Sequence, residues 1–317
     1  MRPEKDKHAV TRESRLEALR DEASQLERTT PAVRTYYDQP YLKPPVWTWE
    51  VPAYFFAGGV AGIAAMIAAV GSFAGADPRL VRDARWVAAA GAILSPLLLI
   101  SDLGRPGRFL NMLRVFKLQS PMSIGAWTLA LFAPAVLAPI AIDALLPGGG
   151  TISHFAVMLA DVVALLTGLV LATYTGVLIG ATTLPVWAAH ARVLPLHFGA
   201  SSLGAAVSII ELCGHFTPVM NLLGLAAALA ATVIGTRLEL RRLSPASVLG
   251  QGSGGLATRL GDVFSGPVPF ILRLTSAGWL PGRLVASVSA VAGSILTRYG
   301  WMQAGRRSAI ESRVHHN

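Results

Sequence analysis

Four titratable side chains interrupt segments that are otherwise strongly apolar. His154 and Asp161 are seven residues apart, two turns of a helix, which would place both on one face. Glu211 and His215 are four residues apart, so a helix would make them neighbours on one face as well. Carboxylates and imidazoles can hydrogen-bond a polar ligand and pass protons, and histidine changes its charge near neutral pH. The pattern therefore indicates polar binding and proton transfer inside a hydrophobic region.

The segments around these residues predict an all-α protein, a polytopic membrane helix bundle. Hydrophobic residues make up 53% of the 317 positions and charged residues only 14%, unlike ordinary soluble domains. Apolar runs long enough to cross a bilayer predict helices over residues 49–73, 86–100, 122–146, 154–184, 196–212 and 220–236. A seventh span is expected over 284–296, between Trp279 and Trp301, which suit the two water interfaces. We expect an eighth, broken span over 263–280, which contains Arg273, and seven spans are the alternative.

Basic residues collect in alternate connections, as expected if short cytoplasmic loops retain lysine and arginine. The N-terminal tail (1–45) and the loop 101–120 are rich in them, whereas 146–153 and 213–218 contain none. We therefore place the tail and the loop 101–120 in the cytoplasm. The segment 77–85, with three arginines on the outer side, is the exception.

The expected organisation is a charged cytoplasmic tail (1–45), a transmembrane domain (46–300) and a C-terminal tail (301–317). An even number of spans would also place the arginines of the C-terminal tail inside the cell, which favours eight over seven. The net charge of +9 then lies mainly beside an anionic inner leaflet. Nucleic-acid binding is not needed to explain this charge.

Each polar residue also has a structural interpretation. A charge at the centre of a membrane helix costs about 2.5–3.5 kcal/mol on insertion scales, which favours a functional role. However, His154 and His215 could lie at helix ends, and Glu211 could simply pair with His215. Tyr174 lies about 220° around the helix from Asp161, so it would not share that wall of a site.

The stretch SDLGRPGRFLNMLRVFKLQSPMSIGAW joins the second and third predicted spans. Arg105 and Arg108 can each fork onto a carboxylate or a lipid phosphate. Asp102 and Glu50 lie at similar depth and could begin a proton route from the inner side, or Glu50 could pair with one of these arginines. Ser120 is the expected N-cap of the next helix. On physical grounds alone, a capped interfacial hairpin whose arginines reach the lipid headgroups is the favoured interpretation of the loop.

The single cysteine, Cys213, excludes an intrachain disulfide and an iron-sulfur cluster held by this chain alone. We interpret it as a buried apolar filler. A haem held by two histidines would need His154 and His215, the pair at similar depth on different helices, and histidines deeper in the spans would be more typical. We therefore expect no haem or iron-sulfur cluster, and no metal site, in this chain.

Several motifs, in order, carry a resemblance to a known family. DLGRP, then RF, then SPMSxGAW are similar to the signature of the NrfD/PsrC family, the polysulfide-reductase-type membrane subunits. Further agreement comes from WEVPAYFFAGGVAG, ATYTGVLIGATTLPVW and TRYGWMQAGRRSA. The resemblance covers most of the chain from about residue 47 onward.

The resemblance implies two four-helix bundles that bind a quinone, ubiquinone or menaquinone, as substrate. It implies docking to an iron-sulfur subunit and a catalytic, possibly molybdopterin, subunit in a bacterial cytoplasmic membrane. The protein would then exchange electrons with quinone as part of a respiratory complex and would not be catalytic alone. His154, Asp161, Glu211 and His215 are the candidate quinone and proton ligands, and the resemblance adds Tyr174 through its YTG stretch.

Two other functions remain open. A transporter with a buried charged substrate site is the main alternative, because the glycine- and proline-rich stretch 250–269 resembles a broken membrane helix. No internal repeat is obvious, which weakens that alternative. A dihaem cytochrome b is a minor option that a visible spectrum would test.

Overall fold

The structure is a computed structural model that describes residues 14–21, 45–103, 106–242 and 252–311. These residues form helices and turns and contain no β-strand. A short helix covers residues 14–21. The long helices are α2 (Glu50–Phe73), α3 (Pro78–Asp102), α4 (Pro121–Leu145), α5 (Thr151–Gly180), α7 (Leu194–Leu212), α8 (Pro218–Arg242) and α11 (Leu280–Glu311). The shorter ones are the 3₁₀ helix η2 (Pro106–Leu113), α6 (Pro185–Ala189), α9 (Gly252–Ser265) and α10 (Pro267–Thr275).

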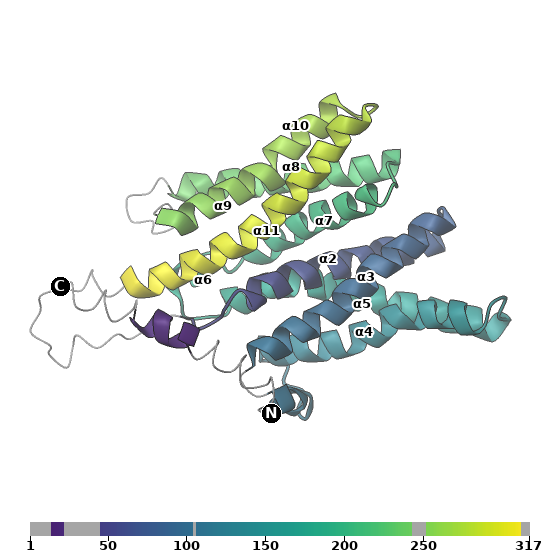
Figure 1. Cartoon of the computed structure of the whole chain (residues 1–317), viewed down its shortest axis with the longest axis horizontal. Coiled ribbons are helices and arrows are strands. Elements are labelled where there is room, and N and C mark those ends of the chain that lie inside the picture. Colours follow the sequence, from purple (N-terminus) through teal and green to yellow (C-terminus); the bar gives the residue numbers. More distant parts are fainter. Residues whose placement is uncertain (1–13, 22–44, 104–105, 243–251, 312–317) are drawn as a thin grey trace, which may run out of the picture.

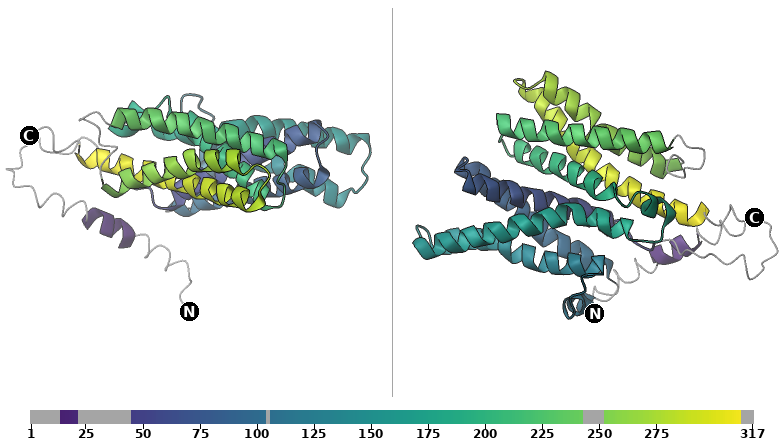
Figure 2. Two further views of the ribbon diagram at one scale, coloured as in Figure 1. Left: turned by 90° about the horizontal axis from the view of Figure 1, so that it is seen from above. Right: turned by 180° about the vertical axis from the view of Figure 1, so that it is seen from behind.

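The helices form two groups that lie side by side (Figure 1). We call α2 to α5 the first bundle and α7 to α11 the second bundle. The right-hand view in Figure 2 shows the same division. Helices α2 and α5 pack against α7, and α11 lies beside α2. We call the end where α2 begins the inner end and the end where α2 meets α3 the outer end. The short helix of residues 14–21 lies near the inner end (Figure 1).

Local sequence explains where the helices begin. Ser120 caps α4 by accepting a hydrogen bond from the Ser123 amide, with Pro121 in the first turn, as the sequence predicts. Asp77 caps α3 in the same way, accepting from the Arg79 amide at 2.9 Å. Close packing needs glycine at some positions: a Cβ on Gly168 of α5 would lie 2.5 Å from a backbone carbonyl oxygen of α2.

The second bundle contains a broken helix. Gly266, with φ −113° and ψ −96°, separates α9 from α10, and Pro267 begins α10. A Cβ on Gly266 would lie 2.9 Å from the Thr232 hydroxyl of α8, so α8 packs closely against the break. The sequence predicts a broken helix over 263–280, and the break at Gly266 falls within that range. The first part of the broken helix, α9, begins at Gly252, which is earlier in the chain than expected.

Six helices of the described residues are long and apolar enough to cross a membrane: α2, α3, α4, α5, α8 as far as Leu240, and α11 as far as Ile310. Their flanks expose large apolar side chains, as expected for contact with lipid; Leu97, Leu166 and Leu222 are 58%, 58% and 66% exposed. The polytopic helical bundle expected from the sequence is therefore confirmed. The helix predicted over 284–296 is longer than expected, because α11 continues through residues 301–311.

Candidate functional site

A buried ion pair joins two helices in the outer half of the first bundle. Arg85 of α3 donates to Asp161 of α5, with 2.9 Å between Nη2 and Oδ2. Asp161 is only 3% exposed. The other guanidinium nitrogen, Nη1, lies 3.5 Å from Oδ2 of Asp143 on α4, whose side chain is 67% exposed. The three residues therefore connect a buried carboxylate to one that reaches water.

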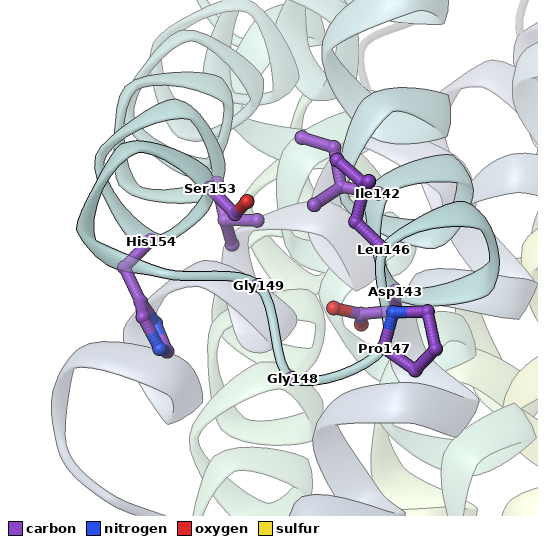
Figure 3. Close-up of a pocket in the computed structure, with 9 residues that line it drawn as sticks. Ile142, Asp143, Leu146, Pro147, Gly148, Gly149, Ser153 and His154 are labelled. Atoms are coloured by element: carbon purple, nitrogen blue, oxygen red, sulfur yellow. The ribbon is translucent and has the colours of Figure 1, made fainter.

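A pocket of about 150 Å³ opens at the outer turn between α4 and α5; Asp143 lines it, whereas Arg85 and Asp161 do not. Figure 3 shows Asp143 and His154 on opposite sides of the glycine turn, each contributing polar atoms to the pocket region. Apolar side chains of both helices complete its walls, among them Ile142, Leu146 and Val157. The pocket is small, and polar and apolar groups share its lining.

The sequence predicts His154 and Asp161 for this region, but it does not identify Arg85. The sequence signal for Arg85 was its place in the segment 77–85, whose three arginines on the outer side are the exception to the charge pattern. A second arginine of that segment, Arg82, contacts Asp83 at 3.2 Å. Two of the three outer arginines, Arg82 and Arg85, thus have carboxylate partners. These partners lower the free-energy cost of placing positive charges at the outer end.

Glu211 lies elsewhere, in a closed cluster of the second bundle. It is fully buried, and its carboxylate binds Arg273 at 2.7 Å and also binds Arg283. Ser287 donates to Oε2 at 2.6 Å, and Arg273 also donates to Ser208 at 3.0 Å. Two arginines for one glutamate give the cluster one excess positive charge. The structure therefore does not bring Glu211 together with Asp161.

The expected pairing of Glu211 with His215 is wrong. Helix α7 ends at Leu212, and the chain turns at Gly214 with φ +105°, a conformation that favours glycine. His215 consequently leaves the helix face and places Nε2 2.8 Å from Oδ2 of Asp83 on α3. This contact joins the outer ends of the two bundles.

Tyr174 is buried in the first bundle, with 6% exposure, and packs against Gly125 of α4. A side chain at position 125 would overlap the tyrosine ring, so glycine leaves the room for it. Tyr174 lies thirteen residues further along α5 than Asp161, about 20 Å toward the inner end. It is therefore remote from the outer pocket.

At the inner end, the Thr48 hydroxyl contacts both acids that the sequence predicts there. It donates to Glu50, and it lies 3.1 Å from Oδ1 of Asp102. The predicted partner Arg105 lies outside the described residues, as does the side chain of Arg108. Glu50 and Asp102 thus share one polar cluster.

Cys213 is exposed at the outer end of α7, so its interpretation as a buried filler is wrong. Partial burial raises the pKa of the Cys213 thiol, and the negative charge of Asp83 raises it further. Cys213 is the only cysteine of the chain, which makes it a specific chemical handle at the outer end.

The model of the polysulphide reductase NrfD family matches residues 40–217. The chain belongs to the NrfD family. The match covers more than half of the chain, including the first bundle and α7, and it confirms the resemblance read from the motifs. As an NrfD protein with six candidate spans, the chain is an integral membrane protein. No curated protein matches the chain.

The NrfD match includes Arg85, Asp143, His154 and Asp161, and it ends before α8 begins. The outer pocket therefore lies in the part that this NrfD protein shares with its family. Helices α8 to α11 lie beyond the matched part.

Proposed function

We propose that this NrfD protein is the quinone-interacting membrane subunit of a respiratory oxidoreductase complex. The observation that carries the proposal is the buried Arg85–Asp161 ion pair, which Asp143 links to the outer pocket, within the family-matched part of the chain. A buried charge is costly, which favours a functional role for the pair.

The chemistry of a quinone headgroup fits the side chains around the pocket. Its two carbonyl oxygens accept hydrogen bonds, which the Arg85 guanidinium and the His154 imidazole can donate. Reduction takes up two electrons and two protons, and oxidation of the quinol returns them. His154 and the exposed Asp143 can exchange these protons with outer water. Asp161 holds Arg85 in position.

The electrons would come from, or go to, an iron-sulfur subunit that docks on this chain. A catalytic subunit, such as a molybdopterin protein, would lie beyond the iron-sulfur subunit. The Asp161 carboxylate lies ten residues from the outer start of α5, about 15 Å along the helix.

We propose a bacterial cytoplasmic membrane with the N-terminus inside, because Arg237, Arg306 and Arg307 all lie toward the inner end.

We further propose that α7 and the α9–α10 pair complete eight spans in two four-helix bundles. Helix α7 runs the length of the second bundle, and α9 and α10 lie against α8 and α11 (Figure 1). An even number of spans places both chain termini on the inner side.

The transporter alternative is favoured by one observation, the break between α9 and α10. The outer side of that break is filled by Arg273, whose guanidinium binds Glu211 and packs on Gly224 of α8. Family membership favours the quinone function instead.

Binding of a short-chain quinone to the intact complex tests the proposal. Arg85→Gln removes one charged hydrogen-bond donor, worth about 1.5–3 kcal/mol, so quinone affinity should fall about 10- to 100-fold. His154→Ala and Asp161→Asn should also abolish quinone-linked turnover while the complex still assembles. The matched control is Arg82→Gln on the same helix, whose side chain is 65% exposed.

Loss of Arg85 alone leaves Asp161 buried without its cation, so the double variant Arg85→Gln/Asp161→Asn separates binding from folding. This variant removes both charges; asparagine keeps the shape of Asp161, whereas glutamine is shorter than arginine. Normal quinone affinity in the assembled double variant would refute the proposed site.

A further inference from the structure

A second buried titratable pair lies in the second bundle, far from the outer pocket. Nε2 of His197 on α7 is 3.2 Å from Oδ1 of Asp262 on α9. The His197 side chain is fully buried, and within the described residues neither of its ring nitrogens has a hydrogen-bond partner, so the contact of Nε2 with Asp262 is a close approach of charges rather than a hydrogen bond. A buried polar atom without a partner is uncommon, and it leaves one site on the ring free for a proton.

The pair lies deep within the inner half of the bundle. Asp262 is ten residues from the inner start of α9, about 15 Å along the helix. The His197 ring packs edge-on against Trp301, with 6.2 Å between the ring centroids. Trp301 is itself ten residues, about 15 Å, from the inner end of α11. Ionisable groups at this depth are costly, which argues for a role.

One other charge faces the pair from α11. Arg298 is 1% exposed and donates to the backbone carbonyl of Phe198, the residue after His197, at 3.1 Å. Its remaining acceptors in the described residues are neutral oxygens of Ser201, Ser202 and Ser294. Arg298 therefore places a buried positive charge beside Phe198, the neighbour of His197 on α7.

The other elements around the pair contribute few charges. Helix α8 presents Gly235, where a Cβ would lie 3.3 Å from the Cβ of Asp262. Next to α6, His190 packs on Trp301 at 5.5 Å and contacts the Val186 carbonyl through Nδ1 at 2.8 Å. His190 is thus a second buried histidine, but its Nδ1 already has a partner.

Glu239 lies on the inner side of the pair and is more exposed than either of its members. Glu239 lies one turn beyond Gly235 on α8 and contacts Arg259 of α9 at 2.9 Å. Arg259 is three residues from Asp262, on the same side of α9. The exposed fraction of the acidic and imidazole side chains falls from 40% at Glu239 to 13% at Asp262 and 0% at His197.

We propose that His197 and Asp262 form a proton-binding site that is filled from the inner side past Glu239 and is separate from the outer pocket. A proton taken from inner water binds the free ring nitrogen of His197, and the resulting imidazolium faces the Asp262 carboxylate. No electron moves, and the local charge rises by one. Asp262 and Glu239 lie on helices beyond the NrfD match, so the site is a property of the second bundle.

Infrared difference spectra of the full-length protein in lipid nanodiscs test this site without quinone turnover. The wild type should show a pH-dependent imidazole band coupled to a carboxylate band. Other histidines also contribute, and His215 contacts the carboxylate of Asp83, so the signals of the proposed site are those that differ between the wild type and His197→Gln. Asp262→Asn should remove the carboxylate band, and His197→Gln should remove both signals. The matched control, His190→Gln, changes another buried histidine beside Trp301 and should keep both.

The direction of proton uptake is tested in sealed vesicles of known orientation. Glu239→Gln should slow the response to a pH step on the inner side and leave its amplitude unchanged. A wild-type spectrum without a coupled signal would overturn the proposal even if no variant folds. A folded His197→Gln protein whose spectrum equals that of the wild type, or a His197-dependent signal that responds only to outer pH, would overturn it as well.

Discussion

Replacement of Glu211 by glutamine distinguishes a structural role of this residue from a role in quinone binding. The carboxylate is fully buried and forms ion pairs with two arginines, Arg273 and Arg283. Glutamine keeps the size of the side chain but leaves both cations buried without a counter-charge. Breaking a buried ion pair in this way costs about 3–5 kcal/mol. We take a Tm shift of about 2 °C for each kcal/mol of lost stability, the lower end of the usual range, because the chain is long. The Tm should therefore fall by about 6–10 °C.

Thermal unfolding followed by tryptophan fluorescence in nanodiscs measures this shift. The matched control is Glu239→Gln, which breaks the half-exposed pair with Arg259 and should cost less than about 1 kcal/mol. Quinone affinity of the folded Glu211→Gln protein should equal that of the wild type. A normal Tm together with lost quinone binding would show that Glu211 belongs to the quinone site and would refute the reasoning.

Two further predictions follow from single contacts. Gly224→Ala should destabilise the protein by about 1–3 kcal/mol in thermal unfolding, because the new Cβ would lie 2.7 Å from Nε of Arg273. The control is Gly204→Ala, which should be almost neutral because the nearest atom to its new Cβ would be 3.7 Å away. Cys213 should react with a membrane-impermeant maleimide added from the outer side, and slowly at pH 7, because its raised pKa keeps the thiol protonated. Its reaction rate should rise as the pH increases above about 8.5, and labelling only from the inner side would contradict the proposed topology.

The spans could be predicted from the sequence because bilayer thickness sets their length and apolar character. The start of α4 was also predictable, since Ser120 and Pro121 are local signals that act within one turn. The broken helix was expected because Arg273 interrupts an apolar stretch among glycines and prolines. Each of these features depends on residues that are near one another in the chain.

The partners of the buried charges could not be predicted, because they depend on which helices meet. His215 was assigned to Glu211 on helical spacing, but the turn at Gly214 moves it to Asp83, 132 residues away in the chain. Arg85 appeared only as an exception in the charge pattern, and its contact with Asp161 depends on how α3 and α5 are placed around α2 and α4. His197 and Asp262 are likewise joined only by tertiary structure.

The central claim, that quinone binds in the outer half of the first bundle, is tested most directly by photolabelling. An azido-quinone is irradiated with the intact complex, with and without excess unlabelled quinone, and the labelled peptides are identified by mass spectrometry. Competed label should lie in peptides that contain Asp143, His154 or Asp161. Competed label confined to α8–α11, or no competed label on this chain, would contradict the account.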